Sequence, residues 1–133
     1  MSRTLPEQRL WARFRKQIHG MYMRVENIAA PGTPDVWTAR AGWIELKVPR
    51  RAARAATPIL GPGTLRTEQR AWFRAAAHAG AKAWVVAELD GKACYAAIPA
   101  ADVEAALTTP GTEARARWGH PTLAELWAAI AKS

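Results

Sequence analysis

The sequence contains a single cysteine, Cys94, and only three histidines, which lie far apart in the chain. One thiol excludes an internal disulfide and every zinc site built from several cysteines. No apolar run approaches the roughly 20 residues that a membrane-spanning helix needs. Residues 1–7 also lack the apolar stretch of a secretory signal. We therefore expect a cytoplasmic protein that does not contact a membrane.

Charge is abundant but unbalanced. The 133 residues include 19 Lys and Arg against 11 Asp and Glu, which gives a formal net charge of +8. This length fits one domain, and the basic excess favours a polyanionic partner, with nucleic acid ahead of a membrane surface. Residues 61–64, Gly-Pro-Gly-Thr, lack the Lys-Ser/Thr ending of a phosphate-binding P-loop, so no nucleotide cofactor is expected.

Capping residues and apolar spacing predict the order of elements. Thr4, Pro6 and Glu7 indicate a helix start, and Gly20 is its expected end. Turn residues separate further elements: strands near 21–28, 36–39, 43–48, 83–87 and 93–98, and helices near 67–79, 102–107 and 123–132. We interpret residues 49–64 as a long loop, and the Pro-Gly-Thr tripeptides beginning at 31, 62 and 110 as turns.

The resulting order is α, β, β, β, α, β, β, α. It indicates an α/β (α+β) fold with a central mixed sheet flanked by helices. We expect one domain over residues 1–133, with its core at about 4–98 and a helical extension at about 100–133.

One predicted hairpin brings together residues that can do chemistry. Glu45 and Lys47 alternate with apolar residues, so they share one face of their strand. If residues 40–42 form a three-residue loop, counting back along the hairpin places Asp35 opposite Lys47. A two-residue loop would instead turn Asp35 to the other face. The three-residue loop therefore predicts a compact patch of two carboxylates and one ammonium.

Two carboxylates so close raise at least one pKa unless a cation joins them. Mg²⁺, for which Mn²⁺ would substitute, suits an oxygen-only site and leaves room for a substrate phosphate. The metal would lower the pKa of a bound water, while Lys47 would orient that water or stabilise developing negative charge. The alternative is that Asp35 is a turn residue and that Glu45 and Lys47 form an exposed pair.

The same residues resemble a known group of enzymes. Gly-Thr-Pro-Asp-Val at 32–36, followed by Trp-Ile-Glu-Leu-Lys at 43–47, resembles the active-site hairpin of the PD-(D/E)xK nuclease superfamily. It is similar in particular to the VRR-NUC branch and to Holliday-junction-resolvase-like members, many of them phage-encoded. The likeness continues with Leu-Arg-Thr-Glu-Gln at 65–69 and an apolar strand after Gly80, and spans about residues 6–98. It implies a restriction-endonuclease-like core in αβββαβ order.

The resemblance also implies an activity and a set of roles. It implies a Mg²⁺-dependent endonuclease that hydrolyses DNA phosphodiester bonds, prefers Holliday junctions or other branched DNA, and acts as a homodimer in a bacterial cytoplasm. Asp35, Glu45 and the backbone carbonyl of Leu46 would hold the metal, and Lys47 would be the catalytic lysine. Gln69 would lie beside them. Helical spacing independently turns Gln69 inward, although an ordinary early-helix glutamine is the alternative.

Two further acidic residues are candidates for completing the metal site. Glu7 matches the glutamate that members of this family often carry on their first helix, but it also suits a capping box. Glu26 follows on the next predicted strand, where a surface pair with Arg24 is its alternative role. The sequence leaves open which of the two carboxylates completes the site.

Six arginines flank the predicted site and would contact DNA phosphates in a salt-dependent manner. They are Arg50, Arg51 and Arg54 in the loop, and Arg66, Arg70 and Arg74 on the second helix. Each one taken alone also fits a solvated surface cation. Three other functions stay open: a nuclease for flaps, ends or linear DNA, a catalytically silent nucleic-acid-binding module, and a basic structural or partner-binding protein.

Overall fold

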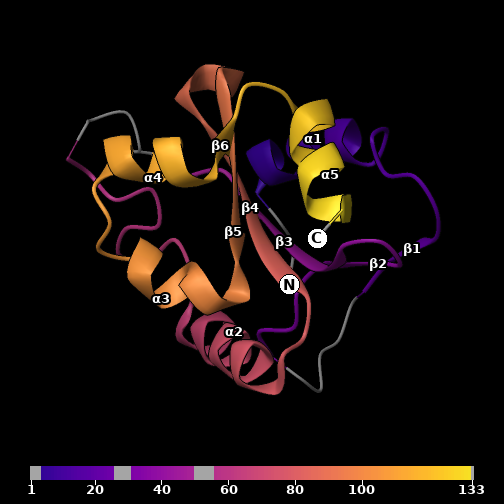
Figure 1. The fold of residues 1–133 in the computed structure, drawn as a ribbon, viewed down its shortest axis with the longest axis horizontal. Helices are drawn as coiled ribbons and strands as arrows, with labels where there is room; N and C mark the ends of the chain where they lie inside the picture. Colours follow the sequence, from indigo (N-terminus) through magenta and orange to yellow (C-terminus); the bar gives the residue numbers. More distant parts are fainter. Residues whose placement is uncertain (1–3, 26–30, 50–55, 133) are drawn as a thin grey trace.

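A mixed sheet forms the centre of the computed structural model, which describes residues 4–25, 31–49 and 56–132 (Figure 1). The strands are β1 (Tyr22–Arg24), β2 (Val36–Thr38), β3 (Gly42–Lys47), β4 (Ala83–Leu89), β5 (Cys94–Pro99) and β6 (Gly119–His120). Within the described residues they form one six-stranded sheet in the order β1-β2-β3-β4-β5-β6. β3 and β4 are parallel, whereas every other neighbouring pair is antiparallel.

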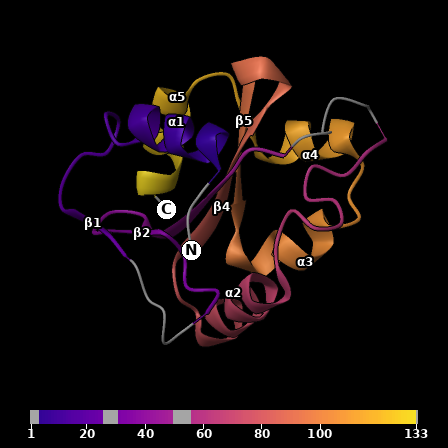
Figure 2. The same ribbon diagram turned by 180° about the vertical axis from the view of Figure 1, so that it is seen from behind.

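Helices cover both faces of this sheet. They are α1 (Leu5–Phe14), α2 (Thr67–Ala79), α3 (Val103–Ala106), α4 (Gly111–Trp118) and α5 (Leu123–Lys132), with short 3₁₀ turns η1 (Asp90–Lys92) and η2 (Ala100–Asp102). Figures 1 and 2 show α1 and α5 together on one side of the sheet and α2, α3 and α4 on the other. This arrangement confirms the expected α/β architecture. In the part of the chain that the structure describes, no helix is both long and apolar enough to cross a membrane.

The core has two halves, one on each face of the sheet. Phe14 of α1 and Leu126 of α5 pack against Ile44 on one face. On the other face, Phe73 of α2 packs in a cluster with Val85. Because the central strands are covered on both faces, β4 is a nearly continuous apolar run, as is usual for strands in parallel pairing.

Helix α1 begins where the sequence predicts and ends earlier than predicted. The hydroxyl of Thr4 accepts a hydrogen bond from the backbone N–H of Glu7 at 3.4 Å, and Pro6 occupies the first turn. The helix ends at Phe14, and turns rather than helix lead to Gly20. Ile18 is still buried, since the turn after the helix returns its side chain to the core. Apolar spacing alone therefore overestimated the helix by one to two turns.

Helix α2 has the predicted bounds. Gly80 follows it with a φ of +74°, the left-handed conformation that ends a helix, and its N–H donates to the carbonyl of Ala77 at 3.2 Å. The inward side consists of Gln69, Phe73 and Ala76, which are all buried. The predicted stripe of spacing i, i+4, i+7 is thus confirmed, including its one polar member.

The β2–β3 hairpin corrects the predicted register. Trp37, not Ala39, lies opposite Trp43, and residues 39–41 form the loop. The hydroxyl of Thr38 closes it, because it accepts from the N–H of Ala41 at 3.0 Å and donates to the carbonyl of Gly42 at 3.1 Å. The observed register differs from the predicted one by two residues. An even shift leaves every side chain on its predicted face.

Three segments differ in structure from what the sequence predicts. In the predicted loop at 49–64, residues 50–55 lie outside the described residues, while Ile59 and Leu60 are fully buried in the α2 face of the core. The Pro-Gly-Thr at 110–112 is not a simple turn, because Gly111 begins α4. The last third of the chain is also more than a helical extension, since it adds β6 to the sheet and packs α5 on its face.

Candidate active site

The β2–β3 hairpin places Asp35 and Glu45 opposite each other. Asp35 immediately precedes β2, and extending the register of Val36 opposite Ile44 by one residue pairs it with Glu45. The prediction that Asp35 lies opposite Lys47 is therefore wrong, because the loop consists of residues 39–41 rather than 40–42. The prediction that Asp35, Glu45 and Lys47 share one face follows from the observed register as well.

Glu45 is buried on this face. Its side chain is 4% exposed, and its Oε2 atom lies 3.7 Å from the Nζ of Lys47, whose side chain is 13% exposed. Its partner on β4 in the parallel ladder is Val85, which belongs to the apolar cluster under α2. A carboxylate at this depth needs hydrogen bonds and a nearby cation to remain ionised. The alternative of an exposed Glu45–Lys47 pair is therefore wrong.

Gln69 supplies one of those hydrogen bonds. Its Nε2 donates to Oε2 of Glu45 at 3.1 Å, and its Oε1 accepts the backbone N–H of Arg66 at 2.9 Å. The side chain thus connects the first turn of α2 to the centre of β3. Both ends of the buried amide are used, which fixes its orientation relative to the carboxylate. The inward direction and polar partner predicted for Gln69 are confirmed.

The segment before Asp35 is held against the same helix. Gly32 has a φ of +90°, and a Cβ atom there would lie 2.2 Å from the backbone oxygen of Glu68. Only glycine combines that backbone conformation with so close an approach. Pro34, which follows in this segment, is buried. The N-terminus of α2 therefore contacts both segments that carry the carboxylates: β3 through Gln69 and the segment before β2 through Gly32.

The backbone carbonyl of Leu46 lies toward the Asp35 side of β3. The N–H of Trp43 donates to the carbonyl of Lys82 at 3.0 Å, so the backbone groups of Trp43 face β4 and those of Leu46, three residues on, face β2. Continued two residues beyond Val36 and Ile44, the register would set Pro34 opposite Leu46. Proline has no N–H to donate, so a carbonyl facing it would keep its oxygen for another partner.

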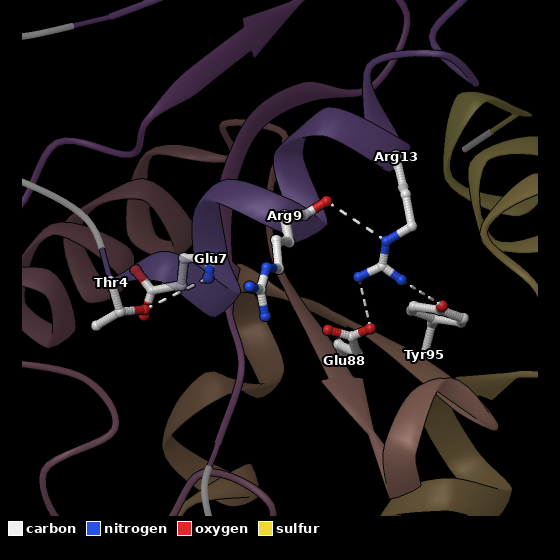
Figure 3. Close-up of polar contacts among 6 residues, drawn as sticks. All are labelled: Thr4, Glu7, Arg9, Arg13, Glu88 and Tyr95. Atoms are coloured by element: carbon white, nitrogen blue, oxygen red, sulfur yellow. Dashed lines mark hydrogen bonds and ion pairs between the residues drawn. The ribbon is translucent and has the colours of Figure 1, made fainter.

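Glu7 and Glu26 are the two candidates for a further acidic ligand. Glu7 lies in the first turn of α1, with its backbone N–H bound by Thr4 (Figure 3), and α1 covers the face of the sheet opposite Glu45. Within the described part of the chain, no three Asp, Glu, His or Cys residues form a group that could hold a metal ion. The structure thus does not bring Glu7 to Asp35 and Glu45. Glu26 lies outside the described residues.

The arginine stripe on α2 is engaged by an acidic residue. Arg70 and Arg74 bind the carboxylate of Glu104, in the first turn of the neighbouring α3, at 3.2 and 2.8 Å. These hydrogen bonds, with the one from Arg74 as the strongest cause, lower the pKa of Glu104 below its usual value. Arg66 is exposed at the start of α2. Arg50, Arg51 and Arg54 lie outside the described residues.

One buried polar cluster was not predicted. Glu88, on the α1 side of β4, is 7% exposed and accepts a hydrogen bond of 2.6 Å from Nη2 of Arg13. The same guanidinium donates from Nη1 to the hydroxyl of Tyr95 at 3.3 Å, which joins α1, β4 and β5 (Figure 3). A charged residue inside the apolar run of β4 was the available signal, since such a residue must find a partner when buried.

A second ion pair braces the turn beyond β4. Both carboxylate oxygens of Asp90 accept hydrogen bonds of 2.7 Å from Arg115 of α4, and these hold the pKa of Asp90 below its usual value. Asp90, Gly91 and Lys92 all have positive φ, at 53°, 60° and 77°. Burial raises the pKa of the nearby Cys94 thiol. The predicted Asp-Gly hairpin between β4 and β5 is confirmed, but it needs a longer left-handed turn than two residues.

The arrangement around β3 can do specific chemistry. The hairpin register brings the Asp35 and Glu45 carboxylates to the same level in the interior of the sheet, an ammonium and an amide lie beside Glu45, and the Leu46 backbone carbonyl follows on the same strand. Such a set suits a hard divalent cation and an anionic substrate. No protein-family model, curated protein or solved structure matches this chain. Its function is therefore inferred from this geometry.

Proposed function

We propose that this chain is a metal-dependent endonuclease that hydrolyses DNA phosphodiester bonds. The observation that carries the proposal is the hairpin geometry: the register of β2 and β3, continued by one residue, brings Asp35 level with Glu45, and Lys47 and Gln69 both contact Glu45. This acidic pair occurs in a chain with a net charge of +8. A metal ion between carboxylates, within a basic protein, is what a polyanionic phosphate substrate requires.

The donor set fits a hard divalent ion. Asp35, Glu45 and the Leu46 carbonyl present only oxygen atoms, which Mg²⁺ and Mn²⁺ prefer over softer ligands. These three groups would hold the ion, with no further carboxylate required from Glu7. When bound, the ion would supply a water of lowered pKa and compensate negative charge on the phosphate.

Lys47 and Gln69 would assist the hydrolysis of the phosphodiester bond by water. Water adds its oxygen to phosphorus while one P–O ester bond breaks, so one strand end keeps the phosphate and the other becomes a hydroxyl. The Lys47 ammonium, on the same face as both carboxylates, stabilises the negative charge that grows on the phosphate oxygens. Gln69 holds the Glu45 carboxylate in one orientation through its amide.

The order of elements supports a restriction-endonuclease-like core. From α1 through β1, β2 and β3 to α2 and β4, the chain follows the αβββαβ succession that the PD-(D/E)xK superfamily resemblance implies. Residues 32–36, 43–47 and 65–69, on which that resemblance rests, lie together around β3 and the start of α2. By the same resemblance we propose branched DNA as substrate and a homodimer as the active form.

A cleavage assay tests the proposal. The wild-type protein is incubated with a four-way junction, a flapped duplex and a linear duplex, each with Mg²⁺ or with EDTA. We expect Mg²⁺-dependent cuts that fall by about 10²–10³-fold or more in Asp35→Asn and in Lys47→Met. The exposed Glu113, on α4, provides the control Glu113→Gln, which removes one carboxylate and leaves the rate unchanged.

The outcomes separate the alternatives. DNA binding without cleavage under all conditions would overturn the nuclease and favour a binding module. Equal cleavage of the three substrates would overturn the preference for branched DNA. A monomer by light scattering, with full activity, would overturn the homodimer.

A further inference from the structure

A second site, lined by basic residues, lies on the opposite face of the sheet. A concavity of about 320 Å³ opens between the end of α1, the start of β5 and the segment before α5. Arg13, Lys16 and Lys92 line it, together with the ring of Tyr95 and with Thr122. Among the described residues that line it there is no carboxylate. Three cations around one hollow attract an anion of limited size.

Arg13 is the fixed member of the three. Its guanidinium is held by Glu88 at 2.6 Å and by the Tyr95 hydroxyl at 3.3 Å, and its Nε donates to the carbonyl of Arg9 at 3.4 Å (Figure 3). Glu88 balances the charge of Arg13, so the positive excess in the pocket comes from Lys16 and Lys92. A guanidinium already anchored on one side loses little further freedom when an anion binds.

Lys92 is positioned by a strained turn. Its φ of +77° is uncommon for a residue with a side chain, and it follows two other residues in the left-handed region. The paired hydrogen bonds of Arg115 to Asp90 brace the start of this turn. Backbone strain of this kind persists where the surroundings fix it and is concentrated at functional sites. The turn thus fixes the backbone from which a lysine side chain lines the hollow.

The pocket is displaced along β4 from the candidate active site. Lys47 is opposite Ala87 in the parallel ladder, and Tyr95 is opposite Glu88, one residue further along β4. Glu45, opposite Val85, lies three residues before Glu88, which is about 10 Å along a strand. The two sites open on different faces, and a strand of nucleic acid that passes around this end of the sheet is long enough to contact both.

We propose that this pocket binds a phosphate group of a nucleic-acid strand, at a contact distinct from the bond that is cut. The choice of nucleic acid as the source of the phosphate rests on the proposed function. The pocket itself rests on Arg13, Lys16 and Lys92. It serves to position the DNA backbone and carries no sequence preference, as phosphate contacts generally do.

DNA affinity measured against salt concentration, in EDTA so that no cleavage occurs, tests the pocket. Each lost phosphate contact makes the slope of log K against log salt concentration less steep by about 0.9. If wild type and variant bind equally at 1 M salt, the variant then binds about eightfold more weakly than wild type at 0.1 M salt. We expect this change for Lys16→Gln and for Lys92→Asn. Asparagine is chosen because it tolerates positive φ. Lys132→Gln, at the far end of α5, is the matched control and leaves the slope unchanged.

A nuclear magnetic resonance titration distinguishes the source of the phosphate. The backbone amide of Lys92 and the ring of Tyr95 are followed while inorganic phosphate or a single-stranded oligonucleotide is added. Shifts with the oligonucleotide that disappear in Lys16→Gln support the proposal. Shifts with inorganic phosphate alone overturn nucleic acid as the occupant. No shift with either, or unchanged salt slopes in both folded variants, overturns the pocket.

Failure of this proposal and failure of the proposed function give different results. Cleavage that depends on Asp35, together with unaltered salt slopes for Lys16→Gln and Lys92→Asn, overturns the pocket and leaves the nuclease. Altered slopes without any Mg²⁺-dependent cleavage support the pocket and overturn the nuclease. Circular dichroism spectra of both variants show that a changed slope does not come from unfolding.

Discussion

Two glutamates are buried on the central strands β3 and β4, and they face opposite sides of the sheet. Glu88 is joined to Arg13 by a direct, charge-assisted hydrogen bond of 2.6 Å. Glu45 instead has a neutral amide, that of Gln69, at 3.1 Å and an ammonium, that of Lys47, at 3.7 Å. A carboxylate in direct contact with a full counter-charge is already compensated, whereas one with weaker compensation remains able to attract a further cation.

The neighbours of the two glutamates deepen this difference. Across the hairpin from Glu45 lies a second carboxylate, Asp35, whereas Glu88 faces Tyr95 across β4 and β5. Like charges placed opposite each other on a sheet repel. The Glu45 face therefore holds negative charge where folding alone would avoid it, which is the pattern expected of a functional site.

The largest expected effect is the difference in the free energy of unfolding between variants of these two glutamates. Glu88→Gln leaves the Arg13 guanidinium without its carboxylate, and we expect a loss of about 3 kcal/mol in the free energy of unfolding, the lower end for a broken buried pair because Arg13 is partly exposed. Glu45→Gln should cost less than about 1 kcal/mol, since an amide oxygen still accepts from Gln69 and the repulsion with Asp35 is removed. Urea denaturation near pH 7 measures both values.

The comparison fails if Glu45→Gln is as destabilising as Glu88→Gln. The double variant Arg13→Met/Glu88→Leu provides a further check, because an apolar replacement of both partners should recover most of the stability that Glu88→Gln loses. Glu113→Gln on the exposed face of α4 sets the baseline for the loss of one surface carboxylate.

A smaller effect should come from Gly32, which holds the Asp35 segment against α2. Gly32→Ala places a Cβ atom 2.2 Å from the backbone oxygen of Glu68, at a φ of +90°. Gly63 is the matched control, since its φ is +82° and a Cβ atom there meets no atom within 4 Å. We expect Gly32→Ala to cost about 2 kcal/mol more than Gly63→Ala in thermal or urea unfolding, the cost of overpacking beyond that of the backbone conformation.

Cleavage measured on the same two variants sharpens the result. Gly32→Ala should lower the rate of the folded protein because the shifted segment carries Asp35, while Gly63→Ala should not. Equal stabilities and equal rates would show that the contact with α2 does not position the carboxylate.

The smallest effect concerns Asp90, whose ion pair with Arg115 is exposed rather than buried. Because its folded pKa lies below the usual value of 3.8, the pair stabilises the fold above that pH and the contribution is lost as the pH falls through the folded pKa. Asp90→Asn should therefore cost about 0.5 kcal/mol near pH 7, as exposed pairs do, and progressively less as the pH falls below 3.8. Thermal unfolding over this pH range measures the effect, and a difference that does not shrink in acid contradicts it.

Local signals in the sequence were sufficient for several elements. The bounds of α2 follow from its apolar stripe and from Gly80, and those of α5 from its regular apolar spacing. The shared face of Glu45 and Lys47 follows from alternation along one strand. Placing Asp35 on the same face needs only an odd number of residues in the loop. These features depend on neighbours within a few residues, which the sequence displays directly.

Contacts between distant segments could not be predicted in the same way. Gly42 was assigned to the loop, but it begins β3, where the backbone oxygen of Lys82 would lie 2.3 Å from a Cβ atom. Its φ of +80° already suits glycine, and its lack of a side chain is also required by Lys82, 40 residues away and just before β4. The burial of Ile59 and Leu60, and the helix that begins at Gly111, likewise arise from packing against the finished sheet.

Strand β1, at the edge of the sheet, limits how the protein can associate with itself. The apolar side chains Met21, Tyr22 and Met23 are 64%, 40% and 50% exposed, a composition that on a long edge would favour fibrous aggregation. With only three residues in the strand, an added chain gains few backbone hydrogen bonds. The guanidinium of Arg24 packs 5.0 Å from the ring centroid of Trp11 and places a positive charge at the end of the same edge. A short strand and a positive charge are two features by which exposed sheet edges resist pairing with further chains.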